Sequence, residues 1–172
     1  SGTFDYFTEA VNGKAKASRG DYTASEDDNV LVQGVENNKN ALGYFGFAYY
    51  VGHKDKMRAV PIINPKGTGV GPSIEAVNDG SYNPLSRPLF IYVKKAAATT
   101  PIVTAFVEFY LEHDGEFAVR VDYVALPDDV DTRAEEFLKS RVTGSVFVTS
   151  DGAKREGRLR ELYAHENVVD SD

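Results

Sequence analysis

The sequence predicts an α/β protein, and three observations support this prediction. Short apolar stretches rich in β-branched and aromatic residues alternate with segments of helical periodicity. Glycine and proline separate these segments cleanly. No internal repeat or low-complexity tract interrupts the alternation. Because short, apolar strands that alternate with helices are typical of parallel sheets, we expect parallel sheets covered on both faces.

The first 87 residues are expected to contain four helices and two strands. Phe4, Phe7 and Val11 fall on one helical stripe, and the following Asn-Gly pair ends that helix. Ser25 is expected to cap the second helix, with Asp28 three residues later suiting its positive end. Helices are expected at 4–11, from 25 onward, at 47–54 and at 73–78, strands at 41–46 and 58–63, and loops at 14–23, 65–72 and 80–87.

The second half begins with Leu89–Val93, the strongest strand signal in the chain because of its β-branched and aromatic content. Pro101 suits the first position of a helix, which the Asp114-Gly115 pair is expected to close. The pattern at 117–124 fits a strand or a helix equally well. A further amphipathic helix is expected at 127–142, a brief strand at 146–148, and a loose, charged tail from 150, in which Leu159 and Leu162 could dock one turn.

Composition excludes several classes of protein. The chain has 172 residues, enough to bury roughly 70% of its unfolded surface in a core. Its net charge of −7 argues against nucleic acid as a partner. No apolar run has the length of a membrane helix. The chain lacks cysteine, which excludes disulfides and cysteine-based metal or catalytic sites, and it begins with Ser rather than Met, so we expect part of a longer polypeptide.

Catalytic and metal-binding patterns are missing from the sequence. His53, His113 and His165 each stand alone, without a second ligand at metal-binding spacing, and are expected to be exposed. The glycine-rich stretch Gly67–Gly71 lies between prolines and opens no long helix, so it is interpreted as a loop. We therefore expect no catalytic residue, no metal and no cofactor.

One short motif has a functional interpretation. Ser1, Gly2 and Thr3 immediately precede the first helix, where backbone N–H groups are unpaired and the helix dipole is positive. Glycine allows close approach of a ligand, and two hydroxyls flank it as donors. Such a group of neutral donors could hold a tetrahedral oxyanion. A simple helix cap accounts for the same three residues.

Four motifs in the same order resemble one family. They are Ser1–Thr8, Asn40–Tyr49, Pro72-Ser73 together with Tyr82–Tyr92, and Asp122–Pro127. Together they are similar to the periplasmic phosphate-binding proteins of ABC importers, the PstS type, over roughly residues 1–141. The resemblance implies a type II periplasmic-binding-protein-like α/β fold in truncated form, with most of the second lobe and the C-terminal part of the first.

The resemblance also implies a function and a division of the chain. Residues 1–87 would be the remainder of the second lobe, and residues 88–172 the returning segment of the first lobe with its charged tail. Phosphate would lie between lobes that close over it, with Ser1, Gly2 and Thr3 as contacts from the second lobe. The chain would be periplasmic or at the cell surface, either free or lipid-anchored, and would deliver phosphate to an ABC permease.

Other parts of the family's site are missing from this chain. In the family an arginine lies a few residues before the Ser-Gly-Thr motif, and the first-lobe contacts come from an N-terminal half. These contacts include a carboxylate that accepts the proton of hydrogen phosphate and so rejects sulfate. We therefore expect the chain alone to bind phosphate weakly or not at all, and to associate with itself or with the missing N-terminal half.

Two other interpretations stay open at this point. The first is a phosphate-recognising sensor or a phosphatase-like protein on the same scaffold, although Ser1, Thr3, Asp5 and Thr8 have no His or Cys beside them in sequence. The second is a structural α/β domain in which Ser-Gly-Thr is only a cap. The sequence favours the phosphate carrier, which is not an enzyme.

Overall fold

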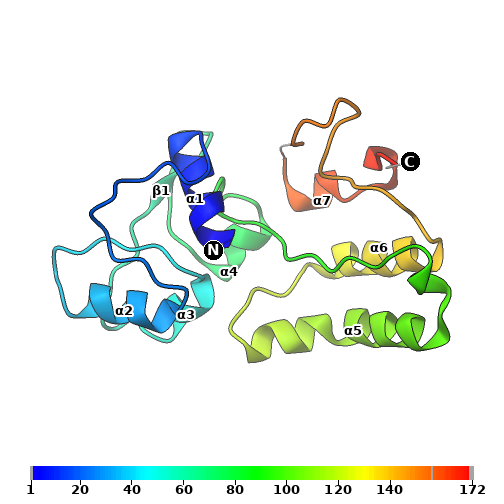
Figure 1. Cartoon of the computed structure of the whole chain (residues 1–172), viewed down its shortest axis with the longest axis horizontal. Coiled ribbons are helices and arrows are strands. Elements are labelled where there is room, and N and C mark those ends of the chain that lie inside the picture. Colours follow the sequence, from blue (N-terminus) through cyan, green and yellow to red (C-terminus); the bar gives the residue numbers. More distant parts are fainter. Residues whose placement is uncertain (1, 156, 171–172) are drawn as a thin grey trace. The chain divides into compact units, whose positions relative to one another are not determined.

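The computed structural model describes residues 2–155 and 157–170. Helices dominate this part of the chain (Figure 1). They are α1 (Gly2–Asn12), α2 (Asp28–Glu36), α3 (Phe47–Val51), α4 (Ile74–Asn78), α5 (Pro101–Arg120), α6 (Asp128–Lys139) and α7 (Leu159–Leu162), with 3-10 turns η1 (Ala97–Thr99) and η2 (His165–Asn167). The helices predicted near these positions are confirmed.

Several helix termini differ from the sequence prediction. Helix α1 begins at Gly2 rather than at residue 4, α3 ends at Val51 rather than at residue 54, and α6 ends at Lys139 rather than at residue 142. Helix α2 begins at Asp28 and is capped by Asp27, whose carboxylate accepts a hydrogen bond from the Asn29 amide at 3.0 Å, so the predicted Ser25 cap is wrong. Helix α5 continues through Gly115 to Arg120, which decides the ambiguous stretch at 117–124 in favour of helix as far as Arg120. Glycine weakens a helix by only about 1 kcal/mol, and the Glu116–Arg120 ion pair at 2.8 Å lies on the added turn.

The predicted parallel sheets are wrong for the described residues. The one sheet there pairs β1 (Ile62–Ile63) with β2 (Gly69–Val70) in antiparallel register, Ile62 opposite Val70. Two isolated bridges, Ser145 with Val169 and Val148 with Lys154, replace the brief strand expected at 146–148. The predicted strands at 41–46 and 89–93 are not formed. Apolar, β-branched sequence favours extended backbone, but a strand also needs a second strand with which to form hydrogen bonds. In the described residues no strand lies beside either of these two segments.

The chain divides into two compact units. Unit 1 contains residues 1–77, 81–86 and 121–123, and unit 2 contains residues 78–80, 87–120 and 124–172. In unit 1 the most buried side chains include Val32 and Thr8, and in unit 2 they include Val107, Val130 and Val146. The assignment of 1–87 and 88–172 to two lobes of a binding protein stays a prediction. None of the helices in the described residues combines the length and apolar character that crossing a bilayer requires.

Acidic side chains gather where α5 packs against α6 in unit 2. Burial raises the pKa of Asp131 from its usual 3.8 to about 6, and the charges of Asp114, Asp128 and Glu135 add to the rise. Burial also raises the pKa of Asp114. Between about pH 4 and pH 6 the folded chain therefore binds more protons at Asp131 than the unfolded chain does. The free energy of unfolding must then fall as the pH rises through this window.

Replacing Asp131 by asparagine is expected to raise the melting temperature at pH 7 and to flatten its dependence on pH between 4 and 6. The variant removes a carboxylate whose charged form is disfavoured by burial and by like charges. Thermal melts at intervals across this pH range measure the effect. Glu136→Gln, at an exposed position on the same helix and not among the charges that raise the pKa of Asp131, is the control and should keep the pH dependence. If the two variants show the same dependence of melting temperature on pH, then Asp131 is not the group that makes stability depend on pH in this range.

Candidate functional site

The predicted oxyanion site lies at the beginning of α1, drawn in blue in Figure 1. Ser1 lies outside the described residues. Gly2 is the first residue of the helix and is exposed, and Thr3 is half-buried. Within the described chain the Thr3 hydroxyl makes no hydrogen bond. The amides of Gly2 and Thr3 have no intrahelical carbonyl to bind, because the first turn of any helix lacks such partners. Two backbone donors and one hydroxyl are thus brought together at the positive end of α1.

A charged pair accompanies this helix terminus. Asp5 lies in the first turn of α1, and its Oδ2 is 3.9 Å from the Lys16 Nζ. Both side chains are well exposed to solvent, so the pair contributes little to stability. The ammonium does, however, offset a carboxylate that would otherwise oppose an anion at the start of α1. No sequence pattern indicates this pair, because ten residues of chain lie between its two members.

Thr8 fixes the next turn of α1 from inside unit 1. It is 2% exposed, and its Oγ1 donates to the Phe4 carbonyl at 2.7 Å. The same oxygen accepts a hydrogen bond from the Lys16 amide, also at 2.7 Å. This contact ties the loop after α1, where Lys16 adopts a φ of +66°, back onto the helix. The buried hydroxyl therefore sets the position of α1 relative to the loop that carries Lys16.

Two aromatic residues hold the other sides of α1. The Phe7 ring stacks on Tyr44 with a centroid distance of 3.8 Å and an interplanar angle of 9°. The Tyr6 hydroxyl donates to the Pro84 carbonyl and lies 3.2 Å from the Ser86 carbonyl. Sequence reasoning missed Tyr6, because nothing in a helical tyrosine indicates which distant carbonyl it meets. Helix α1 is thereby fixed to three separate stretches of unit 1, and its first turn is held in place.

Thr8→Val is expected to destabilise the fold by about 1–3 kcal/mol, because the Lys16 amide loses its buried acceptor. Chemical denaturation measures the change. Thr132→Val on α6 is the matched control, since Thr132 makes the same type of bond to the carbonyl four residues earlier, at 2.8 Å to Asp128, but is exposed. The control should change stability by less than about 0.5 kcal/mol. Equal losses in both variants would show that burial of Thr8 does not matter.

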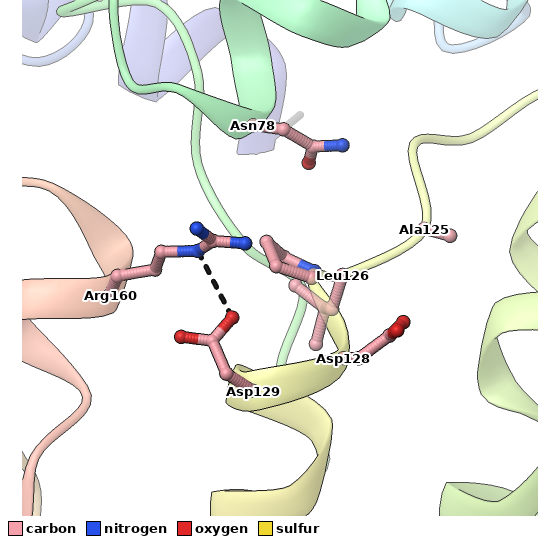
Figure 2. A pocket seen from close by; sticks show the side chains of 7 residues that line it. Asn78, Ala125, Leu126, Asp128, Asp129 and Arg160 are labelled. Carbon is pink, nitrogen blue, oxygen red and sulfur yellow. Dashed lines mark ion pairs between the residues drawn. The ribbon is translucent and has the colours of Figure 1, made fainter.

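A hollow of about 590 Å³ in unit 2 is a second candidate for ligand binding (Figure 2). Its lining contains Asn78, Asp128, Asp129 and Arg160. The Arg160 Nε lies 3.0 Å from Asp129 Oδ1, so this guanidinium is already paired with a carboxylate, as the dashed line in Figure 2 shows. The remaining Asp128 carboxylate would repel an anion. This hollow is therefore less suited to an oxyanion than the start of α1.

The histidines are less exposed than the sequence suggested. His53 is half-buried, with Nδ1 2.8 Å from the Tyr49 carbonyl and Nε2 3.7 Å from a Glu36 carboxylate oxygen. His113 is also half-buried and stacks on Phe109, while His165 is exposed. The expectation of exposure is thus wrong for the first two, because helical spacing brings each ring over the turn before it. Across residues 2–155 and 157–170, no group of three His, Asp or Glu side chains could hold a metal ion.

The chain is similar in sequence to several known proteins. The protein SphX of Synechococcus elongatus is 48% identical over 147 residues, which cover 86% of this chain and 43% of SphX. The phosphate-binding protein PstS of Staphylococcus haemolyticus is 42% identical over 130 residues, covering 74% of this chain and 39% of that protein. The chain thus spans less than half the length of these relatives.

Structure and family comparisons agree with the sequence similarities. A crystal structure described as that of a possible phosphate binding protein from Planctomyces limnophilus matches with a TM-score of 0.70 and 46% identity. The match covers 83% of this chain and 51% of that protein. The family described as PBP superfamily domain matches residues 1–114, a stretch that includes α1 and most of α5. The chain therefore belongs to the PBP superfamily.

Proposed function

We propose that this chain is the C-terminal part of a solute-binding protein that binds inorganic phosphate and delivers it to an ABC importer. The observation that carries the proposal is the start of α1, where Gly2 and Thr3 present unpaired donors on a helix that is fixed at three places. Two relatives whose names state a phosphate-binding role or a possible one support phosphate as the ligand.

In this proposal, recognition uses neutral donors. The backbone amides of Gly2 and Thr3 and the hydroxyls of Ser1 and Thr3 would bind phosphate oxygens at the positive end of the helix dipole. Hydrogen bonds of this kind to a charged oxygen contribute about 1.5–3 kcal/mol each. The other contacts would come from an N-terminal half, including an arginine and the carboxylate that distinguishes hydrogen phosphate from sulfate. Closure of the two lobes would present the loaded form to the permease, in the periplasm or at the cell surface.

Nothing in the described site favours hydrolysis of a phosphate ester. Thr8, the other hydroxyl near the start of α1, is buried and already bonded to the Phe4 carbonyl and the Lys16 amide. No described histidine lies in α1 or in the loop that follows it. We therefore propose a carrier rather than an enzyme, and a phosphatase-like protein or sensor is the alternative to be tested.

A full-length chimera tests the proposal. In it, this chain replaces the matched part of the Planctomyces limnophilus protein, to which it is 46% identical. Calorimetric titration should show tight binding of phosphate and no measurable binding of sulfate. Incubation with a chromogenic phosphate ester should release no product. Hydrolysis by the chimera would instead support the phosphatase-like alternative, and equal affinity for both anions would refute specific phosphate transport.

A further inference from the structure

The Tyr6 side chain joins α1 to the last stretch of unit 1 before the chain enters unit 2. Its hydroxyl donates to the Pro84 carbonyl and lies 3.2 Å from the Ser86 carbonyl. Ser86 is the last residue of unit 1 in this part of the chain, and Arg87 begins the next stretch of unit 2. The contact therefore connects α1 with the position at which the backbone passes from one compact unit to the other.

The backbone is anchored up to Ser86 and is not anchored in the stretch that follows. The Tyr82 amide donates to the Ala76 carbonyl of α4 at 2.9 Å, and the Ser86 amide donates to the Tyr82 carbonyl at 3.1 Å. Residues 88–93 make no backbone–backbone hydrogen bond within the described part of the chain. Hydrogen-bonded backbone resists changes of its dihedral angles, so a hinge motion between the units would begin just after Ser86.

Tyr6 offers one hydrogen-bond donor to two acceptors. A phenolic hydroxyl carries a single proton, so the carbonyls of Pro84 and Ser86 compete for the same hydrogen bond. A small change in the path of residues 84–86 would move this bond from one carbonyl to the other without releasing the segment from α1. The hydroxyl thus allows the end of unit 1 to shift while it stays tied to the helix. Phenylalanine at this position would keep the ring and lose the tie.

Helix α1 connects this contact with the proposed oxyanion site. Gly2 opens the helix, and Tyr6 follows four residues later, about 6 Å further along the helix axis. The backbone between them is a single turn of α-helix, in which hydrogen bonds join residues four apart, so the turn moves as one body. A displacement of the first turn toward a bound anion would therefore reach residues 84–86 through the Tyr6 hydroxyl.

We infer that Tyr6 is a positioning residue for closure of the two lobes, because it ties the carbonyls at which the hinge begins to the helix that holds phosphate. The inference rests on the proposed function for the ligand and for closure itself. In this role Tyr6 makes no contact with phosphate, and it acts by making the position of residues 84–86 depend on the position of α1. Loss of the hydroxyl leaves the donors of Gly2 and Thr3 in place and reduces the fraction of loaded protein that is closed.

Tyr6→Phe in the chimera is expected to weaken phosphate binding by about 10-fold, the effect of one lost hydrogen bond. The ring stays, so the variant should fold, and a thermal melt checks this. Calorimetry gives the Kd of each protein. Small-angle scattering is then recorded with phosphate at about 100 times that Kd, so that every protein is saturated. Under these conditions the radius of gyration of Tyr6→Phe should stay closer to its ligand-free value than that of the unmodified chimera does.

Two control variants separate closure from stability. Tyr49→Phe on α3 removes the same atom, from a hydroxyl that has no hydrogen bond in the described chain. Val130→Ala, at a position 2% exposed in unit 2, lowers the melting temperature by loss of packing. Both should bind phosphate and close like the unmodified chimera. If saturated Tyr6→Phe closes fully, or if Val130→Ala closes as poorly, Tyr6 serves only stability and the inference is overturned. An unmodified chimera that binds no phosphate would instead refute the proposed function, and the role of Tyr6 with it.

Discussion

Phosphate is expected to bind the isolated chain at least about a thousand-fold more weakly than it binds the chimera. About three or four hydrogen bonds from the start of α1 would remain in the isolated chain. The arginine and the first-lobe donors that the resemblance implies would be absent, together with lobe closure. Loss of two or three bonds to a charged ligand, at about 1.5–3 kcal/mol each, corresponds to a factor of about a hundred or more in Kd. The loss of lobe closure is expected to raise this factor to a thousand or more.

Isothermal titration calorimetry of both proteins under the same conditions measures this difference. Sulfate titrated into each protein is the control for binding that depends only on negative charge. Binding of phosphate by the isolated chain with a sub-micromolar Kd would contradict the expectation. It would mean that the described residues already form a complete site, and that the division of the site between two halves is wrong.

In the chimera, Thr3→Val is expected to weaken phosphate binding by roughly 10- to 100-fold. Valine has nearly the shape of threonine but cannot donate a hydrogen bond, and an unpaired phosphate oxygen in a closed site costs about 1–3 kcal/mol. The variant should fold normally, because Thr3 lies half-buried and its hydroxyl has no hydrogen-bond partner within the described chain. Calorimetry and a thermal melt of the same sample separate affinity from stability.

Thr3→Ser is the matched control, since it keeps the hydroxyl and removes only a methyl group. It should bind phosphate within a few-fold of the unmodified chimera. If Thr3→Val binds as tightly as Thr3→Ser, then the Ser-Gly-Thr motif is no more than a helix cap. The motif would then have only a structural role, and the ligand would bind at another part of the protein.

Local signals in the sequence were sufficient for most helices. The stripe formed by Phe4, Phe7 and Val11 predicted α1, and Ser73 caps α4 as its position suggested, with its Oγ accepting from the Ala76 amide at 3.1 Å. These signals succeed because hydrogen bonds of a helix join residues four apart. The predicted capping residue of α2 was wrong by two positions. Ser25 and Asp27 are both good capping residues, and only the path of the backbone decides which of them caps the helix.

Strands could not be predicted in the same way. Leu89–Val93 has the strongest strand sequence in the chain, and yet it has no backbone partner in the described residues. The two-residue strand Ile62–Ile63 does form, because a tight turn returns the chain to Gly69-Val70 beside it. Pairing between strands depends on what lies alongside, so a strand-like sequence gives only one of the two elements that a ladder needs.

The amino-acid order by itself determined that a helix forms at the Ser-Gly-Thr motif, with its start expected two residues after the observed one at Gly2, and which family the ordered motifs resemble. Helix-forming patterns and short motifs are encoded by neighbouring residues. Only the tertiary structure decided that Thr8, Phe7 and Tyr6 fix that helix to Lys16, Tyr44 and the 84–86 carbonyls, and that the Leu89–Val93 backbone lies unpaired beside an apolar groove. Such contacts join residues far apart in the chain. Their geometry follows from the packing of the whole unit, which no local pattern contains.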